Sequence, residues 1–136
     1  IKAMTKVHQY GIMSSPTTSQ FAAIEAMRSC DEEVEEMRRE YNYRRRFIVD
    51  GFREMGLSCF EPLGAFYVFP SIKCTGMTSE EFCEKLLHEQ KVAVVPGTAF
   101  GECGEGFVRC SYAYSIEQIG EALKRIAVFV EKYKKQ

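Results

Sequence analysis

The chain lacks the features that mark membrane-spanning and nucleic-acid-binding proteins. Among its 136 residues, no apolar run approaches the roughly 20 residues needed to cross a bilayer as a helix, so no membrane partner is expected. Its net charge is -1, which gives no reason to expect nucleic acid or an anionic lipid surface as a partner. No long apolar stretch follows the first lysines, so the start of the chain is not a secretory signal peptide.

Metal-ligating residues are few or poorly spaced. The six cysteines contain no C-x-x-C pair, and the only histidines, His8 and His88, lie far apart in the sequence. We therefore expect no metal site. We interpret all six cysteines as reduced thiols of a cytoplasmic protein, because disulfides are rare in that compartment.

What is present is the composition of a globular domain, with 46% apolar and 27% charged residues. The first half of the chain has helical periodicity. Thr17 and Gln20 have the spacing of a capping box at the start of a short helix. A long helix is predicted from Asp31 to Met55, with Gly56 as a left-handed C-cap. Its arginine-rich middle is interpreted as a solvated face with i,i+4 ion pairs rather than a nucleic-acid surface.

From about residue 57 the pattern becomes β-β-α-β-β-α, with strands at 57–61, 65–69, 91–95 and 107–113. Thr78 with Glu81, and Ser115 with Gln118, are predicted to cap the two helices. This order predicts an α+β fold, a small mixed or antiparallel sheet with helices packed on one face. The predicted core contains Phe60, Phe82, Leu86, Val94, Leu123 and Ile126.

Arg109 is the most informative residue, because it lies inside the β-prone run FVRCSYA at 107–113. A strand selects against a guanidinium on a buried face, since a desolvated charge needs a partner. A planar fork in this context suggests a bound carboxylate. The alternative, which the residues leave open, is an arginine on a solvated strand face.

Three segments resemble the class I/II aminotransferases, which are fold-type I pyridoxal-phosphate enzymes. VPGTAFG at 95–101, including the Pro-Gly step, is followed by a glycine-rich loop and FVRCSYA. PLGAFYVFP at 62–70 resembles the family's P-x-G-A-F-Y hairpin. KVHQY at 6–10, with QFAA at 20–23, is similar to the branch that contains aspartate, aromatic and N-acetyl-diaminopimelate aminotransferases.

The resemblance implies a division of the chain. Residues 1–30 would be the end of a large-domain segment, 31–56 a long connecting helix, and 57–136 the C-terminal small α+β domain. The expected partners are an amino-acid or 2-oxo-acid substrate, a large domain outside this chain and a second copy in a homodimer. The expected cofactor is pyridoxal 5'-phosphate, bound mainly by the large domain.

The resemblance also implies substrate-binding residues. Arg109 matches the arginine that grips the α-carboxylate, and Phe66 a position at the pocket mouth. Gly64 would permit a close backbone approach. Tyr10 lies near residues that relatives send across the dimer interface. The alternatives are a core aromatic of the hairpin for Phe66 and packing at a helix end for Tyr10.

No lysine has the context of the family's cofactor lysine, and no glycine-rich loop opens a helix as a phosphate cup would. We therefore expect no catalytic and no cofactor-binding residue here, and expect a C-terminal part that is inactive alone. Three rivals remain open. They are a fold-type I lyase or acyltransferase, the effector-sensing domain of a transcription regulator, and a stand-alone α+β interaction module.

Overall fold

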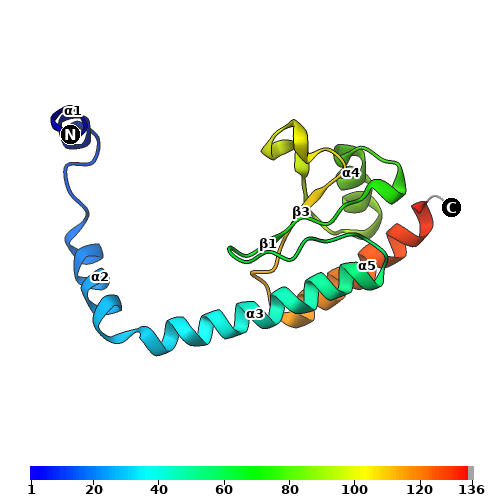
Figure 1. The fold of residues 1–136 in the computed structure, drawn as a ribbon, viewed down its shortest axis with the longest axis horizontal. Helices are drawn as coiled ribbons and strands as arrows, with labels where there is room; N and C mark the ends of the chain where they lie inside the picture. Colours follow the sequence, from blue (N-terminus) through cyan, green and yellow to red (C-terminus); the bar gives the residue numbers. More distant parts are fainter. Residues whose placement is uncertain (135–136) are drawn as a thin grey trace. The chain divides into compact units, whose positions relative to one another are not determined.

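The computed structural model describes residues 1–134. The chain divides into two compact units, Ile1–Arg39 and Glu40–Gln136, which are described separately. The elements, most of which are labelled in Figure 1, are α1 (Lys2–Gly11), α2 (Thr17–Ser29), α3 (Asp31–Glu54), β1 (Tyr67–Val68), η1 (Lys73–Thr75), α4 (Ser79–Gln90), β2 (Val95–Pro96), η2 (Gly97–Phe100), η3 (Glu102–Gly104), β3 (Val108–Ser111) and α5 (Ile116–Tyr133).

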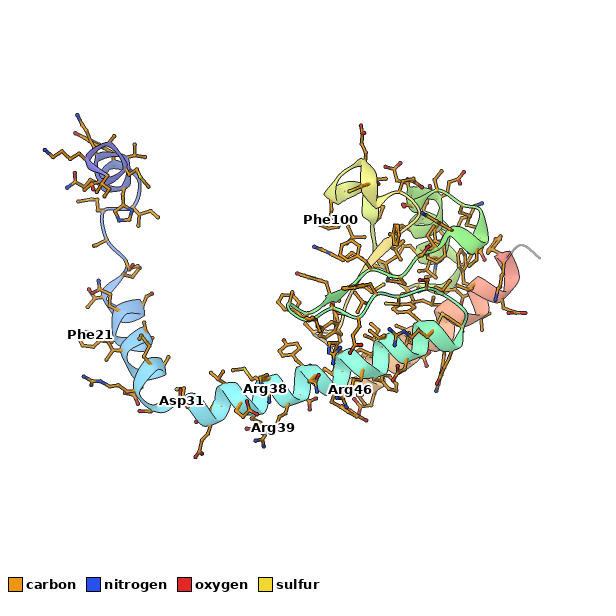
Figure 2. The ribbon with its side chains drawn as sticks, viewed as in Figure 1. Phe21, Asp31, Arg38, Arg39, Arg46 and Phe100 are labelled. Atoms are coloured by element: carbon orange, nitrogen blue, oxygen red, sulfur yellow. The ribbon has the colours of Figure 1, made fainter. Side chains whose placement is uncertain are left out.

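The first unit contains α1, α2 and the beginning of α3. Neither α1 nor α2 buries a residue, and Phe21 stands out from α2 in Figure 2. The predicted capping box of α2 is wrong. Pro16 occupies the N-cap, so Thr17 is already inside the helix and makes no cap hydrogen bond. The side-chain amide of Gln20 instead donates to the carbonyl of Ser15 at 2.9 Å.

Ion pairs cover the polar side of α3. Arg38 and Arg39, labelled in Figure 2, both donate to the Glu35 carboxylate, at 2.6 and 3.0 Å. These hydrogen bonds lower the pKa of Glu35 to about 2. Further along, Glu40 pairs with Arg44 at 2.9 Å. The prediction of a solvated face with i,i+4 pairs is confirmed.

The second unit is built on a three-stranded antiparallel sheet with the order β1-β3-β2. Residues paired across strands share a face, and successive residues alternate between faces. Val68, Val108 and Cys110 are buried in the core, which places Tyr67 and Arg109 on the opposite face. The sheet lies against α4 and α5 in Figure 1. The predicted α+β architecture is confirmed.

The strands are shorter than predicted. The run 57–61 forms no strand and contributes one bridge, between Cys59 and Pro70. Of the strand predicted at 91–95, only Val95 belongs to a strand, β2, and Lys91 instead ends α4 in the left-handed conformation, with φ 57°. Short β-prone runs do not determine where a ladder forms, since pairing requires a partner strand in register.

One hydrophobic core joins the later part of α3 to the sheet, α4 and α5. Glycine permits close contact between α3 and α5, because a Cβ on Gly51 would lie 2.6 Å from Cδ1 of Leu123. Four predicted core residues, Phe82, Leu86, Leu123 and Ile126, are buried. Val94 is half-buried at the margin of the core. The prediction for Phe60 is wrong, since its ring is 78% exposed. Its neighbour Cys59 is buried and makes the bridge to Pro70, so the alternation of an extended chain turns Phe60 to the solvent side.

The capping box of α4 offers a local stability test. Thr78 Oγ1 accepts from the Glu81 amide at 3.2 Å, and the Glu81 carboxylate accepts from the Thr78 amide at 3.1 Å. We expect Thr78→Ala to lower the opening free energy of α4 by about 1 kcal/mol, measured by peptide-resolved hydrogen exchange. Thr17→Ala is the matched control, because α2 has no side-chain cap. Equal effects of the two substitutions on their own helices would contradict this role for Thr78.

The cysteines agree with the reduced state expected from the sequence, since all six are free. Burial raises the pKa of Cys83 to about 11, and it also raises the pKa of the fully buried Cys110 thiol. Among the described residues, no group of three or more His, Cys, Asp or Glu could hold a metal ion. No helix within residues 1–134 is long and apolar enough to cross a membrane.

Candidate functional site

The guanidinium of Arg109 lies between two aromatic rings. Arg109 is in β3, the central strand, opposite Val95 of β2 and on the face away from the core. Its Cζ is 4.2 Å from the ring centroid of Tyr67 and 4.3 Å from that of Phe100. Both distances are well within the range of cation–π attraction. We call Tyr67, Arg109 and Phe100 the aromatic clamp.

Phe100, labelled in Figure 2, lies on the loop between β2 and β3, and this loop places it against Arg109. The loop makes two 3₁₀ turns, η2 and η3, whose backbones contact each other so closely that a Cβ on Gly97 would lie 2.1 Å from the Gly104 carbonyl oxygen. Buried Ser79, at the start of α4, accepts from the Gly106 amide at 2.9 Å. The Ser79 amide in turn donates to the Glu105 carboxylate at 2.9 Å. These contacts hold the loop against α4.

The clamp leaves the hydrogen-bonding edge of Arg109 available. In the described part of the chain, no carboxylate pairs with Arg109 and no acceptor takes a hydrogen bond from its guanidinium. The two ring faces lie against the guanidinium but provide no oxygen or nitrogen acceptor for its N–H groups. An arginine that contacts two aromatic rings and whose N–H groups have no acceptor among the described residues can bind a planar anion, such as a carboxylate, in bidentate fashion.

Phe66 lies next to the clamp and extends it. Its ring centroid is 4.4 Å from that of Tyr67, and the ring is 40% exposed. It also packs at 6.2 Å against Tyr41 of α3. The Tyr67 ring therefore lies between Phe66 and Arg109 as their shared contact. Phe66 itself is at the margin of the core and not inside it.

Gly64 and Tyr10 are placed differently. A Cβ on Gly64 would meet nothing within 4 Å among the described residues, so the expected close approach would have to involve another molecule or segment. Tyr10 belongs to the first unit, at the end of α1, and its side chain is 85% exposed. The roles of both residues remain predictions.

A cavity of about 590 Å³ adjoins Arg109 on another side. Tyr67, Val95 and Ser111 line it from the sheet, together with residues of α5 and of the segment before β2. Phe66 and Phe100 do not line it. The cavity and the aromatic clamp are therefore two surfaces that share Arg109 and Tyr67.

The glycine-rich loop at residues 101–106 does not have the arrangement of a phosphate cup. A phosphate cup needs free amides at a helix N-terminus, whereas the glycine-rich loop leads into β3. Its amides are already bonded within the chain, that of Gly101 to Thr98, that of Gly104 to Gly101 and that of Gly106 to Ser79.

Three lysines of the second unit, Lys73, Lys91 and Lys132, are engaged elsewhere. Lys73 lies over the Phe107 ring, and Lys91 donates to the carbonyl of His88. Lys132 pairs with the Glu89 carboxylate at 2.8 Å. None of these three contacts involves the aromatic clamp, so they provide no amine beside Arg109.

The sequence does not identify two members of the aromatic clamp, Tyr67 and Phe100, as neighbours of Arg109. Both lie inside motifs that had been singled out, the hairpin 62–70 and the segment VPGTAFG. The sequence signal was therefore present, as one aromatic residue in each motif. Only the register of β1 and β3 and the fold of the loop show that both rings meet Arg109.

Comparison with known proteins shows the family. The sequence model described as aminotransferase class I and II matches residues 1–126. A putative aminotransferase of Bacillus subtilis, YugH, is 55% identical over 130 residues, covering 96% of this chain and 34% of the relative. An aspartate aminotransferase of Pyrococcus horikoshii is 52% identical over 134 residues, again covering 96% of this chain and 34% of the relative.

Solved structures give the same result. The crystal structure of an aromatic aminotransferase from Pyrococcus horikoshii superposes with a TM-score of 0.89 at 44% identity. The superposed region covers 93% of this chain and 34% of the solved chain. The chain thus spans about a third of the length of the relatives that it matches. With three matching motifs, the α+β fold and these likenesses, the chain belongs to the class I and II aminotransferase family.

Proposed function

We propose that this chain contributes substrate recognition to a pyridoxal-phosphate-dependent transfer of an amino group between an amino acid and a 2-oxo acid. The observation that carries the proposal is the aromatic clamp, which presents the free edge of Arg109. Every amino-acid and 2-oxo-acid substrate of such a reaction has a carboxylate next to the reacting carbon. Arg109 would hold this shared group in both half-reactions.

The clamp favours orientation as well as affinity. Two hydrogen bonds from a planar fork fix the direction of the carboxylate, whereas a point charge would not. The contacts of the guanidinium with the rings of Tyr67 and Phe100 hold it in place before a substrate binds. A fixed carboxylate positions the neighbouring Cα–H bond for proton transfer, and such orientation contributes to rate.

The groups that would bind the cofactor and move the proton are assigned to a large domain outside this chain. The bonded loop amides and the engaged lysines support this assignment. On this proposal, the chain alone transfers no amino group. Tyr10, exposed on α1, and Gly64, exposed in the hairpin, are proposed to meet a second subunit and the substrate region respectively.

The experiment that tests the proposal is an assay of the complete gene product with pyridoxal phosphate, a panel of amino acids and 2-oxoglutarate. We expect formation of glutamate from at least one amino acid. After borohydride reduction, peptide mapping should place the cofactor adduct on a lysine outside residues 1–136. Elimination products without amino transfer would favour a lyase. An adduct on a lysine of this chain would contradict the assignment of the cofactor site.

A milder test addresses Phe100. Phe100→Leu removes one aromatic face from Arg109 while keeping an apolar side chain. A cation–π contact at a partly exposed site is worth about 0.5–2 kcal/mol, so we expect KM to rise about two- to thirtyfold. Phe60→Leu is the matched control, because Phe60 is exposed and absent from the clamp. A KM for Phe100→Leu equal to that of the control would exclude a role for this ring.

A further inference from the structure

Tyr112 connects the strand that carries Arg109 to the loop that carries Phe66. It lies just beyond β3 and is 2% exposed. Its backbone amide donates to the carbonyl of Phe66 at 2.9 Å. Its hydroxyl donates to the carbonyl of Ala65 at 2.8 Å. One residue therefore holds two consecutive carbonyls of the hairpin loop.

The loop is strained at the residue that the hydroxyl holds. Ala65 has φ 59°, in the left-handed region that residues with a Cβ rarely adopt. The preceding Gly64, which could adopt it freely, is not among the positive-φ glycines. An alanine in this conformation persists only where the surroundings fix it. The Tyr112 hydroxyl is the side-chain contact that does so.

The consequence of this strain is the position of the Phe66 ring. Ala65 immediately precedes Phe66, so its φ and ψ set the direction in which Phe66 leaves the loop. Phe66 then packs against Tyr67 of the clamp at 4.4 Å. A change of Ala65 to an ordinary backbone conformation would move the ring away from Tyr67.

We propose that Tyr112 is a positioning residue, whose hydroxyl holds Ala65 in the left-handed conformation and thereby places Phe66 beside the substrate held by Arg109. The inference rests on the proposed function, because the substrate is what Phe66 would contact. It deepens that function by assigning discrimination between substrate side chains to the Ala65–Phe66 step. Desolvation raises the pKa of Tyr112, which keeps the hydroxyl protonated as a donor.

Three variants of the complete gene product test the inference. Tyr112→Phe removes the hydroxyl and keeps the ring, which packs edge-on against Tyr41. Tyr112→Phe with Ala65→Gly removes the hydroxyl but lets residue 65 adopt positive φ without strain. Tyr43→Phe is the control, because Tyr43 is exposed and, among the described residues, its hydroxyl makes no hydrogen bond to protein. Each variant is assayed against amino acids with large and small side chains, and hydrogen exchange is followed in the peptide containing Tyr112.

In Tyr112→Phe we expect the backbone amide of residue 112 to exchange about five- to tenfold faster. The reason is that the loss of the hydroxyl's hydrogen bond to Ala65 makes local opening easier by the free energy of about one hydrogen bond. We expect KM for amino acids with large side chains to rise about three- to tenfold, with a smaller change in kcat. The preference for large over small side chains should therefore fall. The double variant should recover most of both effects. Recovery of selectivity through Ala65→Gly would show that the backbone conformation of residue 65, and not the Tyr112 hydroxyl by itself, governs the position of Phe66.

Unchanged exchange and unchanged selectivity in Tyr112→Phe would overturn the inference. So would a loss of selectivity that Ala65→Gly fails to restore. Suppose that the wild-type protein transfers no amino group, but that amide exchange in the three variants follows the expected pattern. This result would contradict the proposed function and would retain the hydrogen bond of Tyr112 to Ala65 as a positioning contact. The two failures are therefore distinguishable.

Discussion

Arg109→Lys is expected to lower kcat/KM for amino-acid substrates by about ten- to several-hundredfold in the complete gene product. Lysine keeps the positive charge but loses the planar fork that binds a carboxylate at two points. It also loses the stacking of a flat group between Tyr67 and Phe100. A charge-assisted hydrogen bond contributes about 1.5–3 kcal/mol, which sets the scale of the loss. Because the contact acts during binding and proton transfer, both a higher KM and a lower kcat are expected.

The control for this substitution is Arg46→Lys on α3. Arg46 is exposed and lies outside the clamp, so its replacement should leave the kinetic constants unchanged. The fold should be unaffected in both variants, because the Arg109 guanidinium lies on the sheet face away from the core. Full activity of Arg109→Lys would leave Arg109 as a surface residue of β3 and remove its proposed role.

Leu123→Ala is expected to destabilise the second unit by about 2–5 kcal/mol. Leu123 is buried on α5, and its Cδ1 fills the space above Gly51 on α3, which has no side chain to move into the void. The cavity left by truncation would therefore collapse poorly. Peptide-resolved hydrogen exchange of α3 and α5 along a urea series measures the change.

Leu87→Ala on α4 provides the comparison, because Leu87 is 46% exposed and should lose less than about 1 kcal/mol. If Leu123→Ala changed the unfolding free energy by less than about 0.5 kcal/mol, the proposed contact between α3 and α5 would be wrong.

Elements with their own local signals could be predicted from the sequence. The Thr78–Glu81 box and the Ser115 cap both form as expected, and Gly56 takes the left-handed conformation. In contrast, Thr17 has the same spacing to Gln20 and caps nothing, because Pro16 takes the N-cap position. A capping motif thus predicts the N-cap correctly only when the helix begins directly after its Ser or Thr. In α2 the helix begins one residue earlier, with Pro16 as the N-cap.

Features that depend on distant pairing could not be predicted as well. The run 57–61 has the composition of a strand, yet it makes a single bridge and leaves Phe60 in solvent. Arg109 could be identified from its strand, but Tyr67 and Phe100 reach it through sheet register and loop folding. The positive φ at Ala65 carries no sequence signal, because the adjacent Gly64 is the residue expected to adopt it.

The most direct test of the proposed carboxylate-binding role is discrimination against a substrate that lacks the carboxylate. The ratio of kcat/KM for an amino acid to that for the corresponding decarboxylated amine is measured in the wild-type protein and in Arg109→Lys. If Arg109 binds the α-carboxylate, substitution should reduce this ratio by about tenfold or more, because activity falls with the amino acid and changes little with the amine. An unchanged ratio, with both substrates affected equally or not at all, would contradict carboxylate recognition by Arg109.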